Sequence, residues 1–223
     1  MLKISNSTKY LAIAILIGGK SSRFGSDKGL FKISGKPLTS HLIEKLSEFR
    51  YDIFLVAKSI KQVRNYIEIV DLNKITAFII DEVIDKSNKE LYTPMVGLYS
   101  TFKELKKLKY RKVFALSCDN PLIEKSVLGY LIEQCKSFDC CIPQWTNGFL
   151  EPLFTIYPIN KALVTARKNL KKKTYKLTNL INPNWKTKYI SIEREIQPLD
   201  NNLITFLNIN DPTDLEKLKE KKN

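Results

Sequence analysis

The sequence predicts an α/β protein with a Rossmann-like, three-layer α/β/α fold and a mainly parallel central sheet. Two observations support this prediction: apolar runs of strand length recur along the chain, and they alternate with longer segments whose apolar residues return at helical spacing. Strands separated by helical segments need crossover connections, which produce parallel strands covered by helices on both faces. A chain of 223 residues, 43% of them apolar, is long enough to bury one such core.

Each element is predicted from its own pattern. Buried strands are expected where short apolar runs end at glycine or polar residues, at 11–17, 53–57, 77–80 and 112–117, and again at 153–157 and 189–192. Helices are expected from Pro37 through Phe49 and at 96–108, 123–135, 161–170 and 212–221. The polar and basic segment 171–179 is predicted to be a mobile surface loop.

The chain is predicted to consist of a short extension and one domain. Residues 1–10 are mostly polar and precede the first apolar run, so they are interpreted as an N-terminal extension. Residues 11–223 contain no internal repeat and no linker, so they are interpreted as a single domain.

The composition narrows the classes of function. Thirty-seven basic residues against 23 acidic ones give a formal charge of +14, which favours anionic partners. The longest apolar run has seven residues, whereas a membrane-spanning helix needs about 20, so no membrane span is predicted. Cys118, Cys135, Cys140 and Cys141 form no CxxC pair, which argues against zinc and for reduced thiols in the cytoplasm.

The most informative segment is the glycine-rich loop that follows the first predicted strand, at residues 16–28. Gly18 and Gly19 allow the backbone to approach a ligand and to direct N–H groups toward it. Arg23 and Lys28 add two positive charges. In open α/β sheets, ligands bind beyond the carboxyl ends of the strands, where this loop is expected. The loop therefore predicts a polyanion site.

A second interpretation of the same region is a phosphate-binding loop of the GxxxxGK[ST] type. Residues 14–21 (AILIGGKS) match that pattern except that alanine replaces the first glycine. Three of the four spacer residues are Ile, Leu and Ile, which belong inside a strand and could not wrap a phosphate. No helix N-terminus follows Ser21. This alternative is therefore disfavoured.

Several motifs together resemble the molybdenum cofactor guanylyltransferases, a branch of the Rossmann-like pyrophosphorylase superfamily. They lie at 16–29 (LIGGKSSRFGSDKG), 35–38 (GKPL), 93–97 (TPMVG), 116–121 (LSCDNP), 151–157 (EPLFTIY) and 208–215 (NINDPTDL), with Asp81 between them. The first loop alone would indicate only the superfamily. Its combination with the motifs at 151–153 and 208–210 narrows the resemblance to the cofactor branch, and it implies that 11–223 is a nucleotidyltransferase domain.

The resemblance implies a reaction in which the phosphate of molybdopterin attacks the α-phosphorus of GTP and pyrophosphate leaves. The implied catalytic residues are Arg23, Lys28 and Asp119. The implied nucleotide-binding residues are Leu16, Ile17, Gly18, Gly19, Lys28, Lys58, Asp81, Gly97 and Asp119. The implied acceptor-binding residues are Arg23, Asn208 and Asn210. Lys58 stands where the family often has asparagine, and Ile17 and Phe24 stand where it usually has alanine and methionine.

Magnesium is the expected cofactor, with manganese as a substitute. Asp119 is the predicted metal ligand, because it follows a predicted central strand and Pro121 stops that strand from continuing. Magnesium prefers oxygen ligands and needs only one or two carboxylates beside substrate phosphates. GTP and molybdopterin are the implied partners, with transient contacts to proteins of cofactor biosynthesis.

Two alternatives remain open. The same chemistry could serve another pair of substrates, as in a cytidylyltransferase acting on the pterin or a transferase that activates a sugar or polyol. A non-enzymatic nucleic-acid binder is suggested by the charge of +14 and by Tyr175 and Trp185 near basic stretches. No recognition motif supports it, so nucleic acid is not an expected partner.

Overall fold

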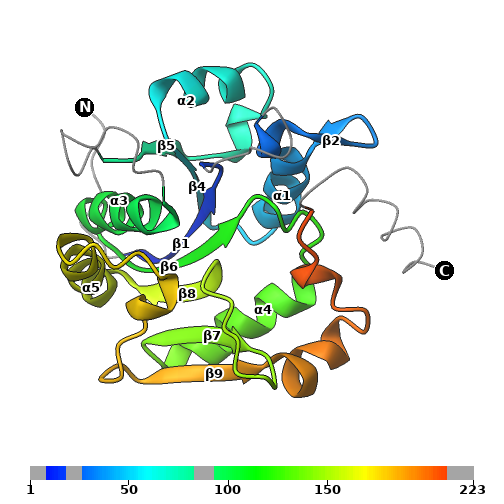
Figure 1. The fold of residues 1–223 in the computed structure, drawn as a ribbon. Coiled ribbons are helices and arrows are strands. Elements are labelled where there is room, and N and C mark those ends of the chain that lie inside the picture. The colour runs from blue at the N-terminus through cyan, green and yellow to red at the C-terminus, as the bar shows by residue number, and fades with distance from the viewer. Residues whose placement is uncertain (1–8, 19–26, 83–92, 210–223) are drawn as a thin grey trace.

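The computed structural model describes residues 9–18, 27–82 and 93–209 of the chain, and its main feature is one seven-stranded sheet (Figure 1). The strand order is β5-β4-β1-β6-β8-β7-β9. The strands are β1 (Lys9–Leu16), β4 (Asp52–Ala57), β5 (Ala77–Ile80), β6 (Tyr110–Ser117), β7 (Cys140–Gln144), β8 (Phe154–Pro158) and β9 (Thr187–Ser191). A separate two-stranded hairpin pairs β2 (Lys32–Ile33) with β3 (Lys36–Pro37).

The first half of the sheet is parallel. β1 lies between β4 and β6 and is parallel to both, with Ile13 opposite Ile53 on one side and Phe114 on the other. β5 is parallel to β4, whereas β8 is antiparallel to both β6 and β7. The chain extends the sheet from β1 first toward β4 and β5, and then on the other side toward β6. The carboxyl ends of β1 and β6 therefore form the topological switch point, where α/β sheets bind ligands.

Helices cover both faces of the sheet (Figure 1). On one face, buried residues of α1 (Leu38–Ser47), α2 (Ile60–Ile67) and α4 (Lys125–Gln134) form a core with Ile13, Ile15 and Leu55. On the other face, α3 (Pro94–Lys107) and α5 (Ile159–Lys171) pack on Ala12, Ala14 and Val56. The predicted three-layer α/β/α fold with a mainly parallel sheet is confirmed.

Short helices complete the described part of the chain. The 3-10 helices are η1 (Lys28–Leu30), η2 (Leu72–Lys74), η3 (Cys135–Ser137), η4 (Leu177–Leu180), η6 (Gln197–Leu199) and η7 (Ile204–Phe206). A π-helix, η5, spans Ile192–Ile196. η4 overlaps the last three residues of the predicted loop 171–179 and ends at the buried Leu180, so this end of the segment packs against the domain, whereas residues 171–174 are exposed.

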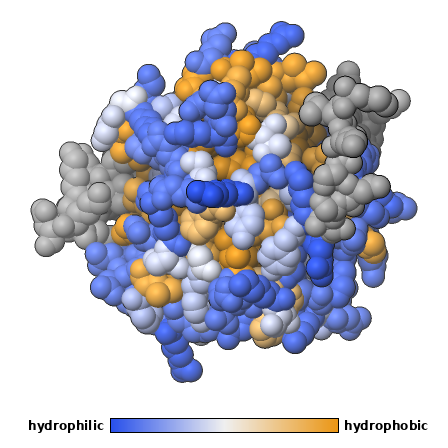
Figure 2. All heavy atoms as spheres, turned by 180° about the vertical axis from the view of Figure 1, so that it is seen from behind, coloured by the Kyte–Doolittle hydropathy of each residue, from blue (hydrophilic) through white to orange (hydrophobic). Residues whose placement is uncertain are grey.

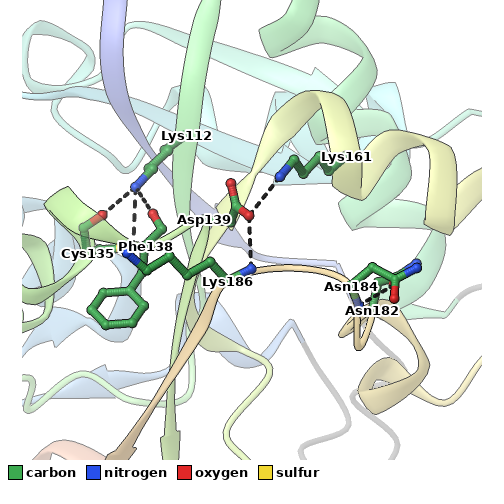
Figure 3. Close-up of polar contacts among 8 residues, drawn as sticks. All are labelled: Lys112, Cys135, Phe138, Asp139, Lys161, Asn182, Asn184 and Lys186. Atoms are coloured by element: carbon green, nitrogen blue, oxygen red, sulfur yellow. Dashed lines mark hydrogen bonds and ion pairs between the residues drawn. The ribbon is translucent and has the colours of Figure 1, made fainter.

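Buried Lys112 ties β6 to η3, the short helix that precedes β7 (Figure 3). Its side chain leaves β6 and donates hydrogen bonds to the carbonyl oxygens of Cys135 and Phe138, the latter at 2.6 Å. Asp139 next to it accepts from the Nζ of Lys161 at 2.7 Å and from the backbone N–H of Lys186 at 3.0 Å. A buried ammonium is costly unless it is paired. These contacts explain how the basic chain tolerates Lys112 in its core.

The structure shifts the starts of β1 and β9, and it adds one α-helix, α2, and three strands, β2, β3 and β7, that were not predicted. β1 begins at Lys9, whose N–H donates to the carbonyl of Lys109 and whose ammonium lies 2.9 Å from Asp52, so residues 9 and 10 belong to the domain and not to the extension. β9 begins at Thr187, two residues before the predicted start. β7 was not predicted, because Pro143 and two cysteines leave its five residues without a clear strand pattern.

Other predictions have simpler outcomes. The extension before residue 9 and the predicted helix 212–221 lie outside the described residues. All four cysteines are buried free thiols, as expected. Among the described residues, no helix has the length and apolar character that a membrane crossing requires.

Candidate functional site

The candidate site lies at the carboxyl edge of the parallel strands. Ile17 follows β1, Lys58 follows β4, Asp81 follows β5 and Asp119 follows β6 by two residues. Backbone hydrogen bonds continue the sheet into this edge, since the N–H of Gly18 donates to the carbonyl of Val56 at 3.2 Å. Four of the predicted site residues are therefore brought to one edge by the parallel register alone.

Lys28 and Asp119 form the centre of this edge. The Nζ of Lys28 lies 2.9 Å from the Oδ2 of Asp119, although the two residues are 91 positions apart in sequence. Their side chains are 17% and 23% exposed, so both are reachable from solvent yet partly desolvated. Partial desolvation strengthens the interaction of each charge with a bound ion or phosphate. The structure thus brings together a cation and a carboxylate that the sequence assigned separately, Lys28 to the triphosphate and Asp119 to the metal.

Gly18 lies where the backbone must pass close to the next strand. A Cβ atom added there would lie 3.3 Å from the backbone nitrogen of Lys58, which is tighter than ordinary contacts. The N–H of Lys58 donates to the Oε1 of Gln62 at 2.9 Å, so its backbone is fixed by α2. Gly18 and Lys58 are therefore neighbours at the switch point, as their joint assignment to nucleotide binding requires.

Gly97, Leu16 and Asp81 form a second group at the same edge. A Cβ atom on Gly97 would lie 3.3 Å from the Cδ2 of Leu16 and 3.4 Å from the Oδ1 of Asp81, so glycine leaves room for both side chains where α3 packs near the ends of β1 and β5. The Oδ1 of Asp81 is buried and accepts no hydrogen bond from the residues that the structure describes. Burial raises the pKa of Asp81 to about 7. A buried, unsatisfied carboxyl oxygen is a group that a ligand donor could satisfy.

Glu151 is a site residue that the sequence analysis quoted in a motif but did not assign. Its Oε1 accepts a hydrogen bond from the indole Nε1 of Trp145 at 2.7 Å. Burial raises the pKa of Glu151, and the nearby charge of Asp119 adds to that rise. The structure thus places a second carboxyl group near Asp119. The only sequence signal for it was the pair Glu151-Pro152 before a predicted strand.

The remaining predicted residues fall into two groups. Asn208 is exposed and precedes Ile209, whose N–H donates to the carbonyl oxygen of Asp119 at 3.0 Å, so this predicted acceptor residue lies beside the centre of the site. The other predicted residues, Gly19, Arg23 and Asn210, lie outside the described residues, as do the lysine and serine of the alternative phosphate loop.

The described residues hold no preformed cluster of three or more His, Cys, Asp or Glu side chains suited to a metal. Asp119 with Glu151 nearby is a different kind of donor set. It suits a hard cation that takes one or two carboxylates and completes its shell with water and substrate phosphates. The donor chemistry therefore fits magnesium bound together with a nucleotide better than a permanently bound metal.

The two aromatic rings that suggested nucleic-acid binding both contribute to core packing. Trp185 is 8% exposed, and Tyr175 packs against the hydrophobic core between the sheet, α3 and α5. Stacking platforms need exposed ring faces beside basic groups. These rings are explained by core packing.

Gly29 is expected to be sensitive to any side chain. An added Cβ atom would lie 2.1 Å from the hydroxyl of Tyr66 and 2.6 Å from the Oγ1 of Thr39, both of which are buried. We expect Gly29→Ala to lower the free energy of unfolding by about 1–3 kcal/mol, the usual cost of overpacking. Urea denaturation would measure it. Gly35→Ala is the control for backbone strain without a clash, because Gly35 has a φ of +80° and no atom near its added Cβ.

Comparisons with known proteins agree with this geometry. The family described as "MobA-like NTP transferase domain" matches residues 13–186, more than half of the chain. A probable molybdenum cofactor guanylyltransferase of Thermococcus sibiricus is 32% identical over 92% of this chain and 95% of its own length. A molybdenum cofactor guanylyltransferase of Campylobacter jejuni is 28% identical over 95% of this chain and 96% of its own length.

A solved structure shows the same fold. The crystal structure of molybdopterin-guanine dinucleotide biosynthesis protein A from Archaeoglobus fulgidus matches with a TM-score of 0.71 and 24% identity, over 94% of this chain and 97% of that one. The family match, the relatives and the edge that gathers Gly18, Lys28, Asp81 and Asp119 all indicate the same assignment. The chain belongs to the family of MobA-like NTP transferases.

Proposed function

We propose that this protein is a molybdenum cofactor guanylyltransferase, which transfers GMP from GTP to the phosphate of molybdopterin and releases pyrophosphate. The names of its relatives give the substrates. The observation that carries the proposal is the contact between Lys28 and Asp119 at the switch point of a parallel sheet. A cation and a carboxylate at this position suit the two needs of phosphoryl-type transfer, which are positioning and charge neutralisation.

Lys28 is assigned to the triphosphate. Its ammonium projects from η1, just after the glycine-rich loop, into the edge where Asp119 lies. When GTP binds, the ammonium can exchange part of its contact with the carboxylate for contacts with phosphate oxygens, because lysine is a point charge without a fixed direction. Arg23 is assigned to the same developing charge and to the acceptor phosphate. Lys28 thus neutralises the leaving pyrophosphate.

Asp119 is assigned as the metal ligand. Magnesium, or manganese in its place, would supply the positive charge that stabilises the attacked phosphate. Asp119 would hold the ion through its carboxylate, and Glu151 nearby adds negative charge to the same region. The carboxylate is 23% exposed, so an ion can reach it.

The guanine is assigned to the space beside Asp81 and Gly97. Guanine presents N–H donors at N1 and at its exocyclic amine, and the buried Oδ1 of Asp81 has no donor in the described part of the chain. A donor from the base would stabilise the ionised carboxyl and lower the pKa of Asp81 from its raised value of about 7. The backbone of Leu16, Ile17, Gly18 and Gly19 and the residue Lys58 complete the assigned nucleotide site.

The acceptor is assigned to the other side of Asp119. Asn208 lies there because the backbone N–H of the next residue, Ile209, donates a hydrogen bond to the carbonyl oxygen of Asp119. Asn210 follows in the sequence. Amide side chains can donate to and accept from both phosphate and pterin groups. We also propose a cytoplasmic location, with transient contacts to the proteins that supply the pterin.

A thermal-shift panel of GTP, CTP, UTP and ATP with magnesium tests this proposal. A ligand at 100 times its dissociation constant adds about 2.7 kcal/mol of stability. For a chain of this size, that is a rise in melting temperature of roughly 5–10 °C. We expect GTP to give the largest rise. A larger rise with CTP would instead assign the protein to cytidylyl transfer, and no rise with any of the four would contradict nucleotide transfer.

A further inference from the structure

We propose that Gln62 and Tyr66 are positioning residues for nucleotide transfer, which act through Asp27 to hold Lys28 toward Asp119. The inference rests on the proposed function. It concerns two side chains of α2 that contact Asp27, the residue before Lys28, and that belong to no motif recognised in the sequence.

Asp27 is the hub of this arrangement. It is the N-cap of η1, and its Oδ1 accepts the N–H of Gly29 at 3.1 Å. The same oxygen accepts the hydroxyl of Tyr66 at 2.7 Å. The other carboxyl oxygen accepts from the Nε2 of Gln62. Asp27 therefore fixes the turn that carries Lys28, and two side chains of α2 fix Asp27.

Gln62 joins three segments of the site edge through one amide group. Its Oε1 accepts the N–H of Lys58, which follows β4. Its Nε2 donates to the carbonyl of Ile17, which follows β1, at 2.9 Å, and also to Asp27. The acceptor role of Oε1 fixes which end of the amide faces Asp27. The ends of two strands and the start of η1 are thus tied to one residue.

The orientation of α2 turns two of its polar side chains toward the protein interior and two of its apolar side chains toward solvent. The helix buries Gln62 and Tyr66, which are 4% and 0% exposed, and presents Ile60 and Ile67 to solvent at 59% and 46%. Hydrophobic side chains gather near the top of the molecule in Figure 2, where α2 lies in Figure 1. Burying a polar side chain while exposing isoleucine is unfavourable unless the polar group has an internal task.

The task that the geometry indicates is to preorganise Lys28. A catalytic cation contributes most when its position is set before the substrate binds. Lys28 has a long, flexible side chain, so the position of its ammonium depends on where its backbone is held. The network fixes that backbone on both sides, through the cap at Asp27 and through the carbonyl of Gly29, which accepts from the Oγ1 of Thr39 at 2.9 Å.

Tyr66→Phe tests this inference, because it keeps the buried ring and removes only the hydroxyl. With magnesium present, we expect calorimetric titration to show about 3- to 10-fold weaker GTP binding and a change of less than twofold for GMP. In a Lys28→Ala background, the same substitution should have no further effect on GTP. Gln62→Met should act in the same direction and more strongly, since it releases Asp27, Ile17 and Lys58 together.

Tyr130→Phe is the matched control. Tyr130 lies in α4, and its hydroxyl donates a hydrogen bond to Glu195 at 3.0 Å. Removing this hydroxyl should leave the affinities for GTP and GMP unchanged. Equal losses of GTP and GMP in Tyr66→Phe, or a loss that persists without Lys28, would show a structural role and overturn the inference. Failure of the proposed function is distinguishable, because the wild-type protein would then not bind GTP. In that case, the same variants would be tested with the nucleoside triphosphate that the wild-type protein binds and with the corresponding monophosphate.

Discussion

Asp119→Asn is expected to reduce turnover by at least 10²- to 10³-fold while the protein still folds. Asparagine keeps the size of the side chain but removes the negative charge that a hard cation requires. The charge that accumulates on the attacked phosphate would then lose its main counter-charge. Removing one preorganised electrostatic group at a reacting centre commonly costs about 2.7–4 kcal/mol, which is the expected range. The measurement is pyrophosphate release from GTP with pterin acceptor across a magnesium titration.

The melting temperature is the control for this substitution. Asp119 is partly exposed and its described ion pair is with Lys28, so the loss of that pair should change stability by no more than about 1 kcal/mol. Near-normal turnover at ordinary magnesium concentration would show that another residue holds the metal. Glu151, which lies near Asp119, would then be the next candidate, together with Asp81 and Asn210.

Lys28→Ala is expected to weaken GTP binding by roughly 10- to 150-fold and GMP binding by much less. Its assigned partner is the triphosphate, and a hydrogen bond to a charged group contributes about 1.5–3 kcal/mol. Competition with a fluorescent GTP analogue would give both affinities. Equal losses for GTP and GMP would contradict the assignment of Lys28 to the triphosphate.

Lys20→Ala is the comparison that separates the two interpretations of the glycine-rich loop. A phosphate loop at residues 14–21 would make Lys20 the more damaging substitution. The structure supports the opposite expectation, because residues 14–16 lie inside β1, hydrogen-bonded between β4 and β6, and cannot wrap a phosphate. A greater loss of GTP affinity in Lys20→Ala than in Lys28→Ala would therefore contradict both the placement of residues 14–16 in β1 and the assignment of Lys28 to the triphosphate.

Much of the fold could be predicted because parallel strands are buried on both faces. Runs such as 11–17 and 53–57 are continuously apolar and end abruptly, so each is visible without knowledge of its partners. The antiparallel half was harder to predict. β7 contains Pro143 and two cysteines, and its burial depends on β8 and β9, which follow it in sequence. The start of β1 was not predicted, because Lys9 is held there by Asp52 and Tyr110, which lie far away in sequence.

The fold class, the glycine-rich loop and most candidate site residues can be inferred from the amino-acid sequence, because residues that follow parallel strands all reach the same edge of the sheet. Only the tertiary structure showed that Lys28 faces Asp119, that Glu151 lies near them, and that α2 supports the loop through Gln62 and Tyr66. These contacts join residues far apart in sequence and depend on the twist of the sheet and the packing of helices. No local pattern encodes them, since a buried glutamine on a helix that exposes isoleucine contradicts the very periodicity from which helices are predicted.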